Sequence, residues 1–449
     1  MSGEKLIGLR WIIFLICLGI ASCSQERSSE RLISQLSSRS LKTGNFRVSP
    51  DSKRVAHVVK EGDKGCVVVN GEKGKPYGIS SADSLIFSPD SKRLAYVSGA
   101  NDKVSVVADG KEERPYDRIF QPVFSPDSKR LTYGAGLGFN QLMVVDGKEG
   151  RMYDAVRAFI FSPNSKRLAY TAQVGDRWFV VVDEKEERRY QYKRIDVPVF
   201  SPDSERVAYG AQIDAKQFVV VDGKEEKPYD GVTTPIFSPD SNRVAYVAQV
   251  DEKQFVVVDR EEGKRYDRVG SPCFSPDGKR IGYRAQVGNQ WLVVIDGKEE
   301  KSYDNVGFPL FSPDSKRLAY VAQRGDKQFV VVDRSEEKIY DVVEALIFSP
   351  DSSRLAYAAK TSDRLFVVVD GKEGKPYDGV GGPLFSPDSK RLAHVAITGD
   401  RVCIVVEGKE GKPYDGTLWG ARITFDSPDH FHYLALRKTD IYLVEERIE

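Results

Sequence analysis

The sequence predicts an all-β fold, a β-propeller built from about ten to eleven four-stranded antiparallel blades of 37 residues. The first observation is a repeat: the stretch Phe-Ser-Pro-Asp-Ser-Lys-Arg-Leu-Ala-Tyr at residues 87–96 recurs with few changes, and its proline returns every 37 or 39 residues. These prolines are Pro50, Pro89, Pro126, Pro163, Pro202, Pro239, Pro276, Pro313, Pro350 and Pro387. A fixed period of this length indicates stacked units that each pack only on their neighbours.

The second observation is the content of one repeat. In residues 308–341 an apolar strand (308–311) meets a Ser-Pro-Asp-Ser turn, and further strands are expected at 317–322, 328–333 and 338–341. The proline, aspartate and serine of the turn favour a tight hairpin, and the third strand is rich in valine. Four short strands in 37 residues leave no room for a helix.

The motif Phe-Ser-Pro-Asp-Ser/Gly-Lys-Arg-Leu-Ala-Tyr resembles the WD40-like propeller repeat of the TolB type, over residues of about 46 to 436. The resemblance implies a β-propeller that serves as a protein-binding platform, often in a bacterial envelope. Val-Val-Asp stands where a true WD repeat has Trp-Asp, and the separate N-terminal domain of TolB is missing.

The blade count depends on the chain ends. An eleventh, degraded unit runs from Phe425 to Val444 and contains three strands. We expect its missing outer strand to come from somewhere in residues 31–44, which would tie the two ends together. Eleven units allow one large ring or two tandem rings, and the lack of a linker in the array favours one ring.

The first residues differ from the repeats. Lys5 and Arg10 precede the apolar run 11–20, which is followed by Ala21, Ser22 and Cys23. This pattern is typical of an export signal, and its end resembles the lipobox of bacterial lipoproteins, which implies lipidation at Cys23. The alternative is ordinary secretion with Cys23 unmodified; a transmembrane anchor would need about 20 apolar residues. We therefore expect a signal peptide (1–22), a lipid-anchored flexible tether (23–42) and the propeller (43–449), in an exported, membrane-anchored protein facing the periplasm or the cell surface.

Charge and cysteine content exclude several classes. Lysine plus arginine (67) balances aspartate plus glutamate (66), and the charges recur in every repeat, which argues against nucleic acid as a partner. Cys66, Cys273 and Cys403 lie in apolar strands, and we expect them to be unpaired thiols.

Two residues recur in every one of the ten repeats, an arginine after the turn and a tyrosine at the end of the unit. Arg93 and Tyr116 are examples. We expect the arginine to pair with a carboxylate of its own or the next blade and the tyrosine to fill the gap between blades.

Sequence variety concentrates in the second turn and in the connection between blades, which we expect on the face opposite the constant turns. Loops on a rigid scaffold, and aromatic or arginine side chains in particular, are common in binding sites. The candidates for partner binding are Phe120, Arg157, Phe159, Arg194, Phe308 and Trp419. Trp178 and Trp291 begin third strands and are interpreted as packing residues.

Sequence signals of catalysis are weak, and we expect no enzymatic activity, no cofactor and no bound metal ion. His57 and His394 replace a tyrosine of the second strand, and His430 and His432 lack a third ligand. The sequence has no Gly-x-Ser-x-Gly elbow, and its aspartates are repeated too often to form an acid and base pair. The leading hypothesis is an envelope lipoprotein that binds another envelope protein; a glycan-binding or glycan-cleaving propeller and a structural spacer are the alternatives.

Overall fold

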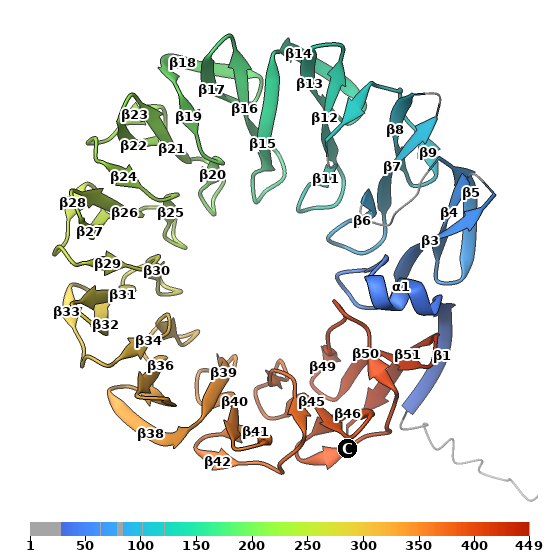
Figure 1. The fold of residues 1–449 in the computed structure, drawn as a ribbon, viewed down its shortest axis with the longest axis vertical. Helices are drawn as coiled ribbons and strands as arrows, with labels where there is room; N and C mark the ends of the chain where they lie inside the picture. The colour runs from blue at the N-terminus through green and yellow to red at the C-terminus, as the bar shows by residue number, and fades with distance from the viewer. Residues whose placement is uncertain (1–27, 63, 79–83, 101, 121, 449) are drawn as a thin grey trace, which may run out of the picture.

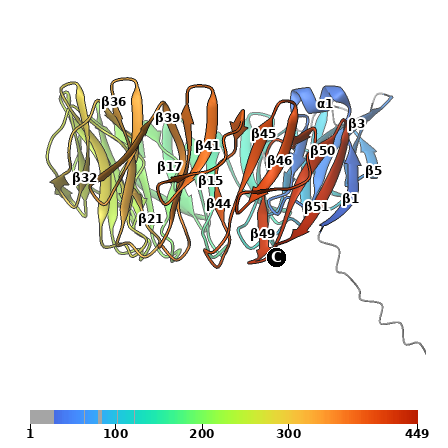
Figure 2. The same ribbon diagram turned by 90° about the horizontal axis from the view of Figure 1, so that it is seen from below.

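A computed structural model of the chain describes residues 28–448, with gaps at 63, 79–83, 101 and 121. In these residues the strands form eleven antiparallel sheets arranged as the blades of one ring (Figure 1). Seen from the side, the ring is a disc one blade thick (Figure 2). The predicted all-β propeller is therefore confirmed, and of the two arrangements considered the structure has the single ring.

Each blade has four strand positions, with the first strand nearest the ring axis. The following strands form blades 1 to 4: β2 (Phe46–Val48), β3 (Val55–Glu61), β4 (Lys64–Val69) and β5 (Glu72–Tyr77); β6 (Ile86–Phe87), β7 (Leu94–Ala100), β8 (Lys103–Ala108) and β9 (Lys111–Glu112); β10 (Arg118–Ile119), β11 (Val123–Phe124), β12 (Leu131–Leu137), β13 (Asn140–Val145) and β14 (Lys148–Tyr153); β15 (Ala155–Phe161), β16 (Leu168–Val174), β17 (Arg177–Val182) and β18 (Lys185–Tyr192).

The following strands form blades 5 to 8: β19 (Arg194–Ile195), β20 (Val199–Phe200), β21 (Val207–Ile213), β22 (Lys216–Val221) and β23 (Lys224–Glu225); β24 (Gly231–Val232), β25 (Ile236–Phe237), β26 (Val244–Val250), β27 (Lys253–Val258) and β28 (Glu261–Glu262); β29 (Arg268–Val269), β30 (Cys273–Phe274), β31 (Ile281–Val287), β32 (Gln290–Ile295) and β33 (Lys298–Glu299); β34 (Asn305–Val306), β35 (Leu310–Phe311), β36 (Leu318–Arg324), β37 (Lys327–Val332) and β38 (Ser335–Tyr340).

The following strands form blades 9 to 11: β39 (Val342–Phe348), β40 (Leu355–Thr361), β41 (Arg364–Val369) and β42 (Lys372–Glu373); β43 (Gly379–Val380), β44 (Leu384–Phe385), β45 (Leu392–Thr398), β46 (Arg401–Val406) and β47 (Lys409–Glu410); β48 (Gly416–Thr417), β49 (Thr424–Ser427), β50 (His430–Arg437), β51 (Asp440–Arg447) and β1 (Ser28–Gln35).

The eleventh blade is completed by β1, which pairs antiparallel with β51 from Ser28 opposite Glu446 to Gln35 opposite Asp440. This confirms the predicted closure, with the strand starting three residues earlier than expected. A short helix, α1 (Ser38–Thr43), follows; the Ser37 side chain caps its first turn and Gly44 ends it in the left-handed region.

The predicted boundary between tether and propeller is wrong, because residues 28–42 belong to β1, α1 and the segment between them. The polar, serine-rich composition that suggested a tether also suits an edge strand at the outer rim. The predicted signal peptide and Cys23 lie outside the described residues. In the part of the chain that the structure describes, no helix has the length and apolar character needed to cross a bilayer.

The hydrophobic core consists of separate layers between neighbouring blades. One layer joins Val293 and Ile295 of β32 to Phe311, Leu318 and Tyr320 of the next blade. Alternate residues of each second and third strand face opposite neighbours, so both faces of a sheet are buried. Each blade thus gains its apolar burial from the blades beside it.

The repeated arginine bridges two blades. The Arg93 Nε donates to Asp109 Oδ2 in its own blade (2.8 Å), and one terminal nitrogen donates to the carbonyl oxygens of Ser128 (2.9 Å) and Lys129 (2.7 Å) in the next. Its guanidinium also lies over the ring of Phe124, 4.9 Å from the centroid. The same ion pair joins Arg130–Asp146, Arg167–Asp183, Arg206–Asp222, Arg243–Asp259, Arg280–Asp296, Arg317–Asp333 and Arg354–Asp370. The predicted carboxylate partner is confirmed, and the contact with the next blade goes to main-chain oxygens.

The repeated tyrosine fills the gap between blades, as predicted. The ring of Tyr116 meets that of Tyr133 in the next blade edge to face, with centroids 6.2 Å apart, and its hydroxyl donates to Glu149 (2.9 Å). Arg114 pairs with the same carboxylate (2.6 Å). The closing strand continues this pattern, because Glu30 of β1 accepts from the Tyr414 hydroxyl (2.6 Å) and pairs with Lys412 (2.7 Å).

The inner turns also connect blades. The serine hydroxyl of each Ser-Pro-Asp-Ser turn donates to the turn's aspartate, as Ser349 does to Asp351 (2.6 Å). The aspartate N–H then donates to a serine hydroxyl of the next blade, as Asp351 does to Ser389 (2.9 Å). At the closing interface Arg422 N–H donates to Ser52 Oγ instead (3.0 Å).

These turns predict an acid-sensitive fold. Hydrogen bonds from the Ser349 hydroxyl and from the N–H and hydroxyl of Ser353 lower the pKa of Asp351 to about 2. The pKa is lowered in the same way at Asp90, Asp127, Asp203, Asp240, Asp277, Asp314 and Asp388. An aspartate in the unfolded chain has a pKa of about 3.9. The stabilisation that these lowered pKa values give to the folded state is therefore complete above that pH and is lost as the pH falls toward 2. Melting temperatures measured from pH 7 to pH 2 should be steady at first and then fall.

The matched variant is Asp351→Asn, because blade 4 has Asn164 at this position with the same turn hydrogen bonds. It should fold and show a smaller drop in melting temperature at acid pH than the unmodified chain. A melting temperature that rises below pH 4 would contradict this account.

Candidate functional site

The variable segments lie on the innermost strands and not in loops of one face. Arg118 and Ile119 pair with β12 as β10, and Val123 and Phe124 pair with the same strand as β11. The interruption of the first strand is short, because the residue after its first part still bonds to the second strand, as Phe120 N–H donates to the Gly134 carbonyl oxygen (2.8 Å). The sequence analysis places these segments on one face from the connectivity of a four-stranded blade; in the structure they belong to, or directly follow, the first part of the interrupted first strand.

The six predicted residues have different positions around the ring. Phe120 is in blade 3, Arg157 and Phe159 are in β15 of blade 4, and Arg194 begins blade 5. Phe308 lies between β34 and β35 of blade 8, and Trp419 follows β48 of blade 11. The structure therefore brings four of them onto three consecutive blades and places the other two elsewhere on the inner wall.

The exposure of their side chains divides the six predicted residues into exposed residues and packing residues. Trp419 is 80% exposed and Phe308 is 56% exposed, and Arg157 and Arg194 are also exposed. Phe120 is half-buried, and its ring would lie 2.7 Å from a Cβ on Gly134. Phe159 is half-buried against the core between blades 3 and 4. Phe120 and Phe159 thus contribute mainly to packing.

Arg157 is held over an aromatic ring of its own blade. Its guanidinium lies 5.2 Å from the centroid of Trp178. Such a stack orients the side chain while leaving its donors available. Trp178, which we interpreted as a packing residue, therefore also positions an exposed arginine.

Blade 7 builds a similar stack from a different strand. Arg284 of β31 lies between Trp291 (4.9 Å) and Phe308 of the next blade (4.5 Å), and donates to the Val306 carbonyl oxygen (3.2 Å). Its first strand has Gly270 where blade 4 has Arg157, and Gly270 leaves the space that the Arg284 side chain occupies. The arginine of blade 7 is therefore on the second strand, whereas that of blade 4 is on the first, and each contacts the tryptophan at the same position of the third strand.

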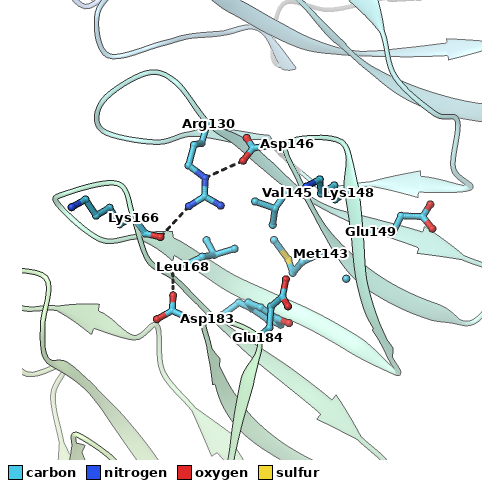
Figure 3. A pocket seen from close by; sticks show the side chains of 12 residues that line it. Arg130, Met143, Val145, Asp146, Lys148, Glu149, Lys166, Leu168, Asp183 and Glu184 are labelled. Carbon is cyan, nitrogen blue, oxygen red and sulfur yellow. Dashed lines mark hydrogen bonds and ion pairs between the residues drawn. The ribbon is translucent and has the colours of Figure 1, made fainter.

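A cavity of about 360 Å³ between blades 3 and 4 was not predicted (Figure 3). Met143 and Leu168 form its apolar floor, and Arg130 and Glu184 lie at its charged rim. Arg130 is not free there, because it is bonded to Asp146 and to the Lys166 carbonyl oxygen (Figure 3).

Gly150 is one of the residues that line this cavity. At the equivalent position blades 5 and 7 have Glu226 and Glu300, which pair with Arg260 (3.0 Å) and Arg334 (3.1 Å) of the following blades. Gly150 lines the cavity together with Glu184. Blades 2 and 3 enclose a similar cavity in which Glu113 stands at the position of Gly150, so the glycine alone does not account for the space.

Phe139 is a second residue that the sequence analysis missed. It lies in the turn between β12 and β13 and is 98% exposed. The equivalent turns are polar, as in Gly325-Asp326-Lys327, so a phenylalanine there was a readable signal.

Two of the histidines, His430 and His432, have structural partners. His432 is buried between Asp426 (2.7 Å from Nδ1) and the Asp51 carbonyl oxygen (2.6 Å from Nε2), and His430 lies 2.9 Å from Asp429. Among the described residues, no group of three or more His, Cys, Asp or Glu side chains is placed to hold a metal ion. Cys66, Cys273 and Cys403 are not in disulfide bonds, as predicted, and among these three only Cys66 is fully buried.

Known proteins add the following. No family model matches the chain, and no curated protein matches it. Similar solved structures include a eukaryotic initiation factor (14% identity, 72% of this chain and 94% of that chain, TM-score 0.39). They also include TolB from Acinetobacter baumannii (15%, 62% and 79%, TM-score 0.27) and the β-propeller domain of the Trilobed protease from Pyrococcus furiosus (14%, 57% and 96%, TM-score 0.28). These similarities concern the fold alone.

The arginine stack of blade 7 can be tested with Gly270→Ala. The new Cβ would lie 2.7 Å from Arg284 Cγ and 3.0 Å from Nε, so the arginine must leave its place between the two rings. We expect the free energy of unfolding to fall by about 1–2 kcal/mol, as for other overpacked sites, measured by urea unfolding. The control is Gly307→Ala at the equivalent position of blade 8, where the nearest atom lies 3.6 Å away. Equal effects of the two variants would contradict the assigned role of Gly270.

Proposed function

We propose that this protein is a non-catalytic scaffold of the cell envelope that binds another envelope protein through the inner wall of its ring. A propeller fold is consistent with such a role. The observation that carries the proposal is the contrast between the repeated and the variable residues. The repeated arginines, tyrosines and aspartates are engaged between blades. In contrast, Arg157 and Arg194 are exposed on first strands, and Phe308 and Trp419 are exposed in the segments that separate the two parts of a first strand.

The chemistry of these exposed residues supports a protein partner. Tryptophan and arginine are enriched among residues that dominate binding energy. Arg157 is already oriented by Trp178 and Phe308 by Arg284, so little side-chain freedom would be lost on binding. The blades supply a rigid frame that holds these groups at set distances around the ring.

The absence of catalysis is part of the same proposal. The carboxylates that recur near the inner turns accept hydrogen bonds from serine hydroxyls and main-chain N–H groups, which keeps them ionised. A general acid would need a carboxyl group whose pKa is raised toward neutrality. Glu187 and Glu446 have raised pKa values through burial, but both accept a hydrogen bond from a tyrosine hydroxyl, Glu187 from Tyr209 of the next blade and Glu446 from Tyr433 of its own blade.

Site-specific photocrosslinking tests the assigned surface. A photoreactive phenylalanine analogue placed at Phe308 or Trp419 should crosslink to one protein in the producing cells, identified by mass spectrometry. The control position is Ile339, which is 50% exposed on the outer strand β38. Crosslinking to the same protein at Ile339, or none at the two inner positions, would contradict the proposal.

The glycan-binding alternative is favoured by one observation, the 80% exposure of the Trp419 ring, on which a sugar can also stack. Binding of cell-wall fragments by the purified chain, lost in Trp419→Ala, would select this alternative over a protein partner.

The proposed anchor is a lipid on Cys23, based on the sequence pattern before it. In cell fractionation the unmodified chain should sediment with membranes, and Cys23→Ser should move it to the soluble fraction. Cys403→Ser, which changes a thiol inside the propeller, is the control and should leave the distribution unchanged. A Cys23→Ser chain that still sediments would contradict lipid anchoring.

A further inference from the structure

The interface between blade 11 and blade 1 lacks the aromatic pair that fills most of the other interfaces in the described part of the chain. At those interfaces a closing tyrosine meets a ring on the second strand of the next blade, whereas Tyr303 of blade 7 meets Phe329 on the third strand of blade 8. The pair Tyr153–Tyr170 has centroids 6.3 Å apart, and Tyr414–Tyr433 has centroids 6.1 Å apart. Blade 11 takes its outer strand from the other end of the chain, and β1 has no tyrosine.

The strand register identifies the replacements. Ser34 pairs with Ile441 at the start of the third strand, as Tyr153 pairs with Gln141 in blade 3. On the other side of the interface, His57 of β3 stands opposite Val68, where blade 3 has Tyr133 opposite Val144. A serine and a histidine therefore take the places of two tyrosines.

A cavity of about 560 Å³, which we call the seam cavity, lies at this interface. Its lining includes Leu32, Ser34, His57, Val59 and Val68. The size is within the range of about 300–1,000 Å³ that is usual for ligand pockets. Leu32 is 49% exposed, so the cavity opens to the outer rim.

Two polar atoms in the seam cavity have no hydrogen-bond partner among the described residues, Ser34 Oγ and His57 Nδ1. Both side chains are buried, with exposures of 3% and 4%. An unpaired buried polar group is costly, and such groups are rare in folded proteins. Burial lowers the pKa of His57, which keeps the imidazole neutral. A hydroxyl group can both donate and accept, so it can satisfy both atoms whichever nitrogen of His57 carries the proton.

An interface within the same ring shows what can pack on a histidine here. Between blades 9 and 10, Tyr377 lies edge to face against His394, with centroids 5.9 Å apart. His394 occupies the position of His57 in its own blade, opposite Val405. The seam cavity thus has the histidine but not the tyrosine.

We propose that the seam cavity binds a tyrosine side chain of a partner polypeptide. The ring would pack against Leu32, Val59 and Val68, and the hydroxyl would reach Ser34 Oγ and His57 Nδ1. A polypeptide is the indicated source because Leu32, Ile33, Ser34 and Gln35 line the cavity along the free edge of the closing sheet. The unpaired main chain of an edge strand can bind an added strand. This site is separate from the inner wall, and either proposal can fail without the other.

The test uses N-acetyl-L-tyrosinamide as the probe, titrated against the purified chain and observed by ligand-detected NMR. We expect saturable binding that is weakened about ten-fold or more by Ser34→Tyr, because the new ring would fill the cavity as Tyr377 fills its own. Ser29→Tyr adds a tyrosine to an exposed position of the same strand and should leave probe binding unchanged. If Ser34→Tyr does not fold, Leu32→Arg at the mouth of the cavity should weaken binding in its place.

Two further probes test the chemistry and the source. N-acetyl-L-phenylalaninamide lacks the hydroxyl and should bind roughly two- to ten-fold more weakly. A blocked extended peptide with a central tyrosine should bind about ten-fold more tightly than the single amino acid, because it can also pair with β1. No saturable binding, or binding unaffected by Ser34→Tyr in a folded chain, would overturn the proposal. Equal affinity for the phenylalanine probe would overturn the role of the hydroxyl, and equal affinity for peptide and single amino acid would overturn the polypeptide source.

Discussion

The structure depends on a guanidinium group that is shared between neighbouring blades. Arg93 holds the start of the second strand to the end of the third through Asp109, and binds two carbonyl oxygens of the next inner turn. Each exposed ion pair of this kind is worth about 1 kcal/mol or less, so a single arginine does not decide stability. Repetition of this contact around the ring connects most neighbouring blades in the same way.

Closure requires that the last interface be made by a segment from the other end of the chain. Glu30 meets this requirement on one side of the closing blade. It accepts a hydrogen bond from Tyr414 and pairs with Lys412, as Glu149 accepts a hydrogen bond from Tyr116 and pairs with Arg114. On the other side the pattern is not reproduced, since Ser34 and His57 replace the tyrosine pair. The same closing strand therefore completes one interface and leaves a cavity at the next.

Sequence analysis predicted the features that repeat. The roles of Arg93 and Tyr116, the blade architecture and the closing strand followed from internal repetition, because a contact needed ten times must be structural. Features that depend on register could not be predicted. The place of Phe308 between the two parts of a first strand required knowing that this strand is interrupted, and the seam cavity required the pairing of Ser34 with Ile441.

The central claim is that one ring of eleven blades is closed by β1. Electron cryomicroscopy of the purified full chain measures this directly, because end-on views show the number of blades and whether the ring is continuous. The account predicts a single closed ring of eleven blades, with the eleventh blade as wide as the others because β1 completes it. Two smaller rings, a different blade number, or a gap between blades 11 and 1 would contradict it.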